Sequence, residues 1–285
     1  MVVRKSRTSI NKALFDACVE NNARKVASLV ESGANIHARD KHMRTPLIAS
    51  IEKGNLEIAR YLLEHGADPN DAVCRYGTPS NPCPTGAIIV NALTLALDSP
   101  EMVKLLIDCG ANAGVVTEEG HTALITLMSK RIKPDGKGDV ALNGDKTQDH
   151  LKVAEILLKN GTDVNRKESY EGNTALIMAV DNDDVEMIKL LLKYGADITI
   201  TNKKGGDVAL KYRSKIVYQL LKEAYLKLSE GRKRGFDDID EWVRAEVYLN
   251  PFPIGRNKKN FKDLSRDKDR NTDKETTDKE TKDKI

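Results

Sequence analysis

Cysteine, histidine and aspartate are the side chains of this sequence that could bind a metal or perform covalent chemistry. The four cysteines are scattered, and Cys74 and Cys83 are separated by eight residues rather than by the two of a zinc knuckle. Asp135, Asp139 and Asp145 lie in a polar stretch, but they lack the Asp-x-Asp-x-Asp-Gly order and the closing glutamate of a calcium loop. We therefore expect free thiols and a solvated loop, with no metal and no cofactor.

The five histidines give no sign of a catalytic site. They are spread through expected turns and loops, and none stands beside a serine or cysteine in a recognisable nucleophile motif. The sequence also lacks a glycine-rich loop of the kind that binds phosphate. A site assembled by the fold from distant residues stays open, but we predict that the protein is not an enzyme.

The composition narrows the class of protein. The 285 residues are 31% charged with a formal net charge of +3, and because the two signs are interspersed, neither nucleic acid nor an anionic membrane is required as a partner. No apolar run approaches the ~20 residues of a membrane-spanning helix, and no secretory signal is recognisable. Irregular cysteine spacing favours a reducing compartment. We expect a soluble cytoplasmic monomer, with a nuclear location as the alternative because of the basic sequence GRKRG.

A sequence motif that occurs five times defines the elements that position the side chains considered above. Each copy has apolar residues at helical spacing and ends at a glycine, as in EIARYLLEHGADPN (57–70) and EMIKLLLKYGADIT (186–199). The closing glycines are 33, 44, 51 and 34 residues apart, at Gly33, Gly66, Gly110, Gly161 and Gly195. Two intervals fit a period near 33, and the other two indicate the same unit with insertions.

Each unit predicts two short helices joined by a tight turn. A threonine opens the first helix at Thr45, Thr122 and Thr174, because its hydroxyl can accept a hydrogen bond from an orphan N–H of the first turn. Glycine ends the second helix because the residue that follows the helix must adopt a left-handed backbone, and that conformation penalises a Cβ. Helices of ~10 residues are too short to be stable alone, so we expect the copies to stack and bury one another's apolar faces.

These residues resemble the ankyrin-repeat family. Four phrases of the second unit follow that family's pattern nearly position by position: Thr45-Pro46-Leu47, Gly54-Asn55, Leu62-Leu63 and Gly66-Ala67-Asp68-Pro69-Asn70. The resemblance covers about residues 10–228. It implies an all-α repeat solenoid of helix-turn-helix units joined by β-hairpin-like loops. Isoleucine stands where the family often has histidine, at Ile48, Ile125 and Ile177.

The predicted array contains about six units over residues 10–228, preceded by an arm of residues 1–9. The first unit lacks Thr-Pro-Leu and the last is degenerate, so both are expected to cap the array. An amphipathic, aromatic-containing extension is predicted at 229–253. The charged tail at 254–285 is expected to be disordered.

Two insertions interrupt the period. The first, residues 71–90, lies where ankyrin-like proteins place a β-hairpin finger, and its prolines predict a semi-rigid extended loop. The second, residues 129–150, is polar and predicts a mobile loop between the two helices of the fourth unit. For the first insertion, a functional role and an idiosyncratic loop without a partner are both open. We expect the two insertions to project from opposite edges of the stack.

The leading functional hypothesis is a module that binds a protein partner through its concave face and the tips of its loops. The tip residues are predicted from their offset from each closing glycine. The first and last tips are basic and the central one is acidic, which predicts a partner of mixed charge rather than a polyanion. The candidate partner-binding residues are Arg39, Lys41, Met43, Arg75, Tyr76, Thr117, Glu118, Glu119, Ser169, Tyr170, Lys203 and Lys204.

Two further hypotheses concern single residues. Trp242 belongs to the predicted amphipathic helix FDDIDEWVRAEVYLN, which either docks on the last repeat or recruits a second protein. Recruitment would make the protein an adaptor, as many ankyrin-like proteins of viruses and intracellular bacteria are. Asn165, in LLKNGTDVN, resembles the asparagine-hydroxylation acceptor of metazoan ankyrin proteins, with a simple hydrogen bond to the hairpin turn as the alternative.

Overall fold

The fold is known from a computed structural model that describes residues 2–74, 89–117, 120–131, 144–203 and 215–227. These residues belong to one compact unit, Met1–Ser229. The predicted extension at 229–253, the predicted tail at 254–285 and the predicted first helix of the sixth repeat lie outside the described ranges.

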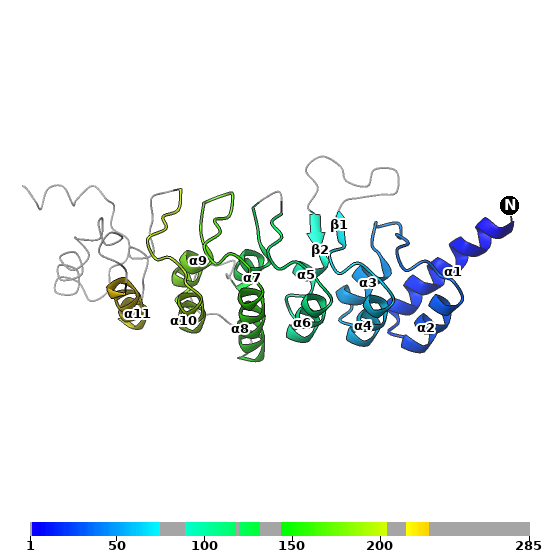
Figure 1. The fold of residues 1–285 in the computed structure, drawn as a ribbon, viewed down its shortest axis with the longest axis horizontal. Helices are drawn as coiled ribbons and strands as arrows, with labels where there is room; N and C mark the ends of the chain where they lie inside the picture. Colours follow the sequence, from blue (N-terminus) through cyan, green and yellow to red (C-terminus); the bar gives the residue numbers. More distant parts are fainter. Residues whose placement is uncertain (1, 75–88, 118–119, 132–143, 204–214, 228–285) are drawn as a thin grey trace, which may run out of the picture. The chain divides into compact units, whose positions relative to one another are not determined.

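More than half of the described chain lies in short helices, most of them paired (Figure 1). Its helices are α1 (Val2–Val19), α2 (Ala23–Glu31), α3 (Pro46–Glu52), α4 (Leu56–Glu64), α5 (Ala92–Leu95), α6 (Pro100–Asp108), α7 (Ala123–Arg131), α8 (Gly144–Lys159), α9 (Ala175–Asp181), α10 (Val185–Lys193) and α11 (Lys215–Leu226). Two short strands, β1 (Ala72–Cys74) and β2 (Ile89–Asn91), form an antiparallel pair.

The helices form two rows. The first helices of successive units, α1, α3, α5, α7 and α9, contact one another in that order, and so do the second helices, α2, α4, α6, α8, α10 and α11. Each first helix also packs on the second helix of its own unit. This is the all-α repeat solenoid that the sequence predicts.

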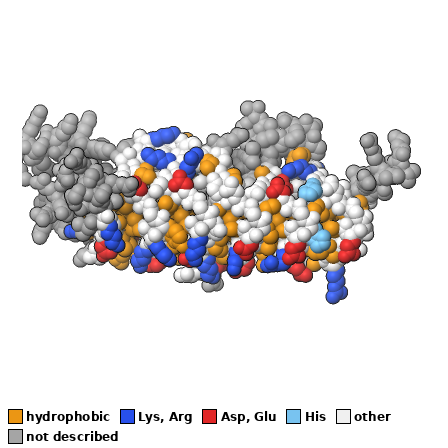
Figure 2. Space-filling view, viewed as in Figure 1, with side chains coloured by type: hydrophobic (Ala, Val, Ile, Leu, Met, Phe, Trp, Pro, Cys, Tyr) orange, Lys and Arg blue, Asp and Glu red, His pale blue; other side chains and the backbone are white. Residues whose placement is uncertain are grey.

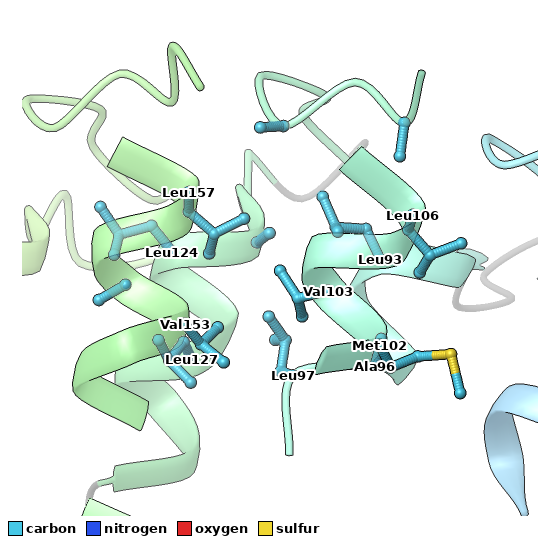
Figure 3. Packing of buried hydrophobic residues seen from close by; sticks show 14 of the residues in the cluster. Leu93, Ala96, Leu97, Met102, Val103, Leu106, Leu124, Leu127, Val153 and Leu157 are labelled. Atoms are coloured by element: carbon cyan, nitrogen blue, oxygen red, sulfur yellow. The ribbon is translucent and has the colours of Figure 1, made fainter. Parts of the chain in front are cut away.

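The core runs between neighbouring units. Leu93 and Leu106 of the third unit and Leu124 and Leu157 of the fourth pack in the layer between their helices and are at most 3% exposed (Figure 3). Burying each such side chain contributes about 1.5–3 kcal/mol. The equivalent leucines Leu62, Leu106, Leu157 and Leu191 are each fully buried, each in the second helix of a different unit.

The predicted helix starts are confirmed. The Thr45, Thr122 and Thr174 hydroxyls each accept the backbone N–H three residues later, at 3.2–3.3 Å. Asn91 takes the threonine's place in the third unit and accepts the Thr94 N–H at 2.8 Å. Capping of this kind stabilises a helix by about 1 kcal/mol.

The predicted helix ends are confirmed as well. The five closing glycines have φ between +82° and +94°, which is the left-handed region where a Cβ is penalised. At Gly66 the next N–H, of Ala67, donates to the Leu62 carbonyl at 2.9 Å, so a carbonyl of the last turn gains a partner.

Helix bounds at two places differ from the expectation. Residues 2–9, assigned to an arm, belong to α1, because residues 2–19 contain no glycine or proline to break the helix. The loop predicted over the whole of 129–150 is wrong at both ends, since α7 continues to Arg131 and α8 begins at Gly144. His150, on the added part of α8, is buried against the Asp98 carboxylate, 3.5 Å from its Nε2. Within the described ranges, no helix is long and apolar enough to cross a bilayer.

Candidate binding surface

The loops between units project from one side of the helical rows (Figure 1). We call them fingers and number them along the chain: finger 1 (34–44), finger 2 (67–91), finger 3 (111–121), finger 4 (162–173) and finger 5, described over 196–203. Residues 75–88 of finger 2 and 118–119 of finger 3 lie outside the described ranges. The predicted tip residues Arg75, Tyr76, Glu118, Glu119 and Lys204 therefore lie outside them too, as does Trp242.

Asparagine side chains join the bases of consecutive fingers. Asn165 Nδ2 donates to the Gly195 carbonyl at 3.3 Å, and its Oδ1 accepts the Asp197 N–H at 2.7 Å. The Asn165 N–H donates to Asp163 Oδ1 at 2.9 Å, which closes a local turn. The hydrogen-bonding role that we considered for Asn165 is thus present. Its hydroxylation stays a prediction.

Finger 1 is tied to finger 2 by Arg39. Its guanidinium pairs with Asp71 Oδ1 at 2.8 Å and donates to the Ala72 carbonyl at 3.1 Å and the Met43 carbonyl at 2.6 Å. Met43 has φ +61°, is half-buried and packs against the core. The residues predicted for this tip are Arg39, Lys41 and Met43. Of these, Lys41 has an exposed side chain that makes none of the described hydrogen bonds or ion pairs.

A carboxylate holds the turn of finger 1. Asp40 Oδ1 accepts the N–H groups of His42 and Arg44 at 2.8 and 2.9 Å, and its Oδ2 pairs with the Arg44 guanidinium at 2.8 Å. Burial raises the pKa of Asp40, but the Arg44 charge and these hydrogen bonds outweigh burial and hold the pKa below its ordinary value. Asp40 is therefore ionised at neutral pH and fixes the turn.

A second carboxylate, that of Glu168, holds finger 4 through backbone N–H groups. Glu168 is 7% exposed, and its oxygens accept the backbone N–H groups of Tyr170, Glu171 and Asn173, the last two at 2.7 and 3.0 Å. Burial raises the pKa of Glu168, but the ring of N–H donors outweighs burial and lowers the pKa below its ordinary value. The turn that carries Tyr170 is therefore pre-organised around one anion.

Tyr170 stands out among the described side chains. It is 85% exposed, the highest value among the exposed large hydrophobic residues of the described chain. Lys203 of finger 5 bonds to the residues on either side of Tyr170. Its Nζ donates to the Ser169 carbonyl, and its N–H donates to the Glu171 carbonyl at 2.8 Å. The structure thus brings Ser169, Tyr170 and Lys203 together at neighbouring tips.

Finger 3 meets finger 4 closely. Thr117 closes the finger 3 turn, since its N–H donates to the His121 carbonyl at 2.9 Å and its hydroxyl accepts the His121 N–H at 3.2 Å. Gly120 in this turn has φ +76°, and a Cβ there would overlap Ser169 Oγ. Both the backbone and the neighbouring finger favour glycine at this position.

Positive side chains gather where fingers 4 and 5 lie, as Figure 2 shows along the upper edge of the molecule. Arg166, Lys167 and Lys203 have exposed side chains in these fingers. The acidic residues that hold the fingers, Asp40, Asp71 and Glu168, were missed by the sequence interpretation. Asp40 and Arg44 are four residues apart, but that spacing predicts a pair only on a helix, so no clear signal in the sequence indicated any of the three.

Comparisons with known proteins agree with this geometry. The family model "Ankyrin repeats (3 copies)" matches residues 4–73 and 140–202. The chain is 34% identical over 119 residues to Ankyrin repeat and KH domain-containing protein mask of Drosophila melanogaster, which covers 41% of this chain and 3% of that protein. It is 27% identical over 175 residues to Ankyrin repeat and SOCS box protein 6 of Homo sapiens, which covers 58% of this chain and 38% of that protein.

A third relative is Protein phosphatase 1 regulatory subunit 27 of Homo sapiens, 45% identical over 56 residues, or 20% of this chain and 36% of that protein. The chain spans less than two fifths of the length of each of these three relatives. Ankyrin repeats generally mediate protein–protein interaction and are typically non-catalytic. The family model, these relatives and the stacked helix pairs identify the chain as an ankyrin-repeat protein.

Proposed function

We propose that the finger edge of the array binds one protein partner and that the protein has no catalytic activity of its own. The observation that carries this proposal is Tyr170, 85% exposed on a turn that buried Glu168 holds in place. Tyrosine is enriched among the residues that dominate binding energy at interfaces. A turn that is already ordered loses little conformational entropy on binding.

The charges around Tyr170 favour a partner with acidic and apolar groups together. Lys203 lies against the same turn, and Arg166 and Lys167 are exposed in the same finger. Glu171 belongs to this turn as well, so the surface is not uniformly positive. Generic duplex DNA is a suitable negative probe, because steep weakening of its binding with salt would indicate a polyanion site instead.

The test uses the full-length protein as bait for quantitative affinity capture, with each captured partner then purified and titrated. Tyr170→Ala is expected to weaken binding by about tenfold or more. Ile216→Ala is the matched control, because Ile216 is also an exposed apolar side chain, 56% exposed, but lies on α11 in the row of second helices. Equal binding by wild type and Tyr170→Ala contradicts the proposal.

An adaptor is the second candidate. In this hypothesis the array binds one protein while the Trp242 segment recruits another. The recruited protein would be, for example, a component of a ubiquitin ligase or a protein of a host cell. One relative, Ankyrin repeat and SOCS box protein 6, is named for a second element beside its repeats, which supports weighing this candidate. Deletion of residues 229–285 separates the two roles: loss of stability indicates a cap, whereas intact folding with loss of one partner indicates an adaptor. A cytoplasmic monomer stays the prediction for location and assembly.

A further inference from the structure

The spaces between successive fingers are not alike. Arg39 spans from finger 1 to Asp71 and Ala72 of finger 2. Gly120 of finger 3 lies against Ser169 of finger 4. Lys203 bonds finger 5 to finger 4. Described contacts therefore bridge these three spaces.

The space between fingers 2 and 3 is joined at its base. Asn70 Nδ2 donates to the Gly110 carbonyl at 3.2 Å, and Asn70 Oδ1 accepts the Asn112 N–H at 2.8 Å. Beyond this link a pocket of about 180 Å³ opens between the described parts of the two fingers. Its apolar walls are Pro69, Ala72, Leu93, Val115 and Val116.

The pocket has the size and chemistry of a site for one side chain. Its volume of about 180 Å³ is below the ~300–1,000 Å³ of pockets that hold drug-sized ligands. No charged residue is among those that line it, so an ionised group would lose hydration there without gaining a partner. Val116 is 37% exposed at this site, an apolar surface that an uncharged aliphatic side chain would cover.

A strand edge borders the pocket. The Ala92 N–H donates to the Asp71 carbonyl at 2.9 Å, and the next pairs along the strands are Ala72 with Asn91, Val73 with Val90 and Cys74 with Ile89. Because bonded and non-bonded pairs alternate in an antiparallel ladder, the backbone groups of Ala72 and Asn91 and of Cys74 and Ile89 point outward. Among those of β2, the Asn91 carbonyl already accepts the Thr94 hydroxyl at 2.9 Å, which leaves the Asn91 N–H and the Ile89 N–H and carbonyl for pairing. The Ala72 carbonyl confirms this direction, since it accepts Arg39 from outside the pair at 3.1 Å.

The outward groups of β2 face the side of finger 3. Arg39 reaches β1 from finger 1, so β1 occupies the finger 1 side of the pair. Figure 1 accordingly shows β1 on the side of α3 and β2 on the side of α5. Asn91 of β2 lines the pocket, and the described part of the sheet contains these two strands alone. An extended chain laid along β2 would therefore pass the mouth of the pocket.

We propose that the space between fingers 2 and 3 binds an extended peptide segment of the protein partner. The segment pairs with β2 as a third strand and places one uncharged aliphatic side chain in the pocket. Backbone pairing of this kind gives affinity to a strand-like ligand, while a side-chain pocket gives specificity. The inference rests on the proposed function, because it describes how part of the partner is held.

The probe is a displayed library of random twelve-residue peptides, selected on the full-length protein and followed by calorimetry with the selected synthetic peptides. Val116→Asp places a charge at the pocket, and Ala72→Ile fills it with a residue that favours strands. Each change is expected to weaken peptide binding by about tenfold or more. Ile216→Ala is the matched control, because Ile216 is an exposed apolar side chain on α11, outside the fingers, and is expected to leave peptide affinity unchanged. Unaltered helical circular dichroism and melting temperature show that the variants fold.

A methyl scan of the peptide tests the strand pairing separately. Methylation of its backbone nitrogens, one at a time, is expected to abolish binding at alternate residues only, because alternate N–H groups face β2. The inference is overturned if no peptide is selected, if selected peptides bind Val116→Asp as tightly as wild type, or if methylation has no alternating effect. Peptides or captured proteins that lose affinity on Tyr170→Ala alone leave the proposed function in place while rejecting this site.

Discussion

Asn70 and Asn165 make the same pair of hydrogen bonds in two different units of the array. Each donates its amide to the closing glycine carbonyl of the next unit, Gly110 or Gly195, at 3.2 or 3.3 Å. Each carbonyl oxygen accepts the N–H two residues beyond that glycine, at 2.8 and 2.7 Å. The fingers are therefore joined to one another through side chains as well as through the helical core.

Replacement of Asn165 by alanine should destabilise the array by about 1–3 kcal/mol, because the half-buried Asp197 N–H and the Gly195 carbonyl lose their partner. Urea unfolding followed by circular dichroism measures this change. Asn160→Ala is the control, since among the described contacts the exposed Asn160 amide donates to the Ile156 carbonyl of the adjoining helix α8, and its loss should cost less than about 0.5 kcal/mol. Equal effects of the two variants would show that the link between fingers carries no stability.

Glu168 should make the free energy of unfolding depend on pH in the acid range. The pKa of Glu168 in the folded protein is lowered by backbone N–H groups, which outweigh burial. The contribution of Glu168 to the free energy of unfolding is therefore complete above the unfolded carboxyl pKa of ~4.3 and is lost as pH falls through the folded pKa. Glu168→Gln should destabilise the protein by about 1–3 kcal/mol at pH 7 and flatten the fall in stability below pH ~4.3. The exposed Glu57→Gln is the charge-matched control. Parallel pH profiles for wild type and Glu168→Gln would contradict this role.

Two cysteines should differ sharply in reactivity. Burial raises the pKa of the Cys18 thiol to about 12, and Cys18 is 0% exposed in α1, whereas Cys109 is exposed after α6. Because the thiolate is the reactive form, iodoacetamide at pH 8 should modify Cys109 in the native protein and Cys18 only after unfolding. Mass spectrometry of the two peptides gives the rates. Rapid labelling of Cys18 without denaturant would mean that α1 does not pack as described.

The sequence predicted the units well because local rules agree with the fold. Thr45 and Gly66 signalled the two ends of a helix pair through a cap and a left-handed turn, and both act as expected. The extent of α8 was misjudged because a polar segment without proline is compatible with loop or helix, and burial of His150 decides between them. Arg39 looked like a free tip residue because its partner, Asp71, lies 32 positions away. The buried role of Glu168 depends on the path of the backbone around it, which residue types alone do not encode.

The Arg39–Asp71 pair should couple fingers 1 and 2 only modestly. The Asp71 side chain is 11% exposed and also accepts a hydrogen bond from the Thr45 hydroxyl. The Arg39 side chain is 38% exposed, so water screens its charge. Asp71→Ala should therefore cost more than Arg39→Ala, and a double-mutant cycle should give a coupling of about 0.5–1 kcal/mol that shrinks in high salt. A coupling near zero at low salt would leave Arg39 available to a partner instead.

The measurement that tests the account most directly is hydrogen exchange on the full-length protein with and without a captured partner, read by mass spectrometry. Binding through the finger edge predicts slowed exchange in residues 162–173 and 196–203, with the second helices α4, α6 and α10 unchanged. Slowed exchange confined to those second helices, with the fingers unaffected, would contradict the assignment of the fingers as the binding surface.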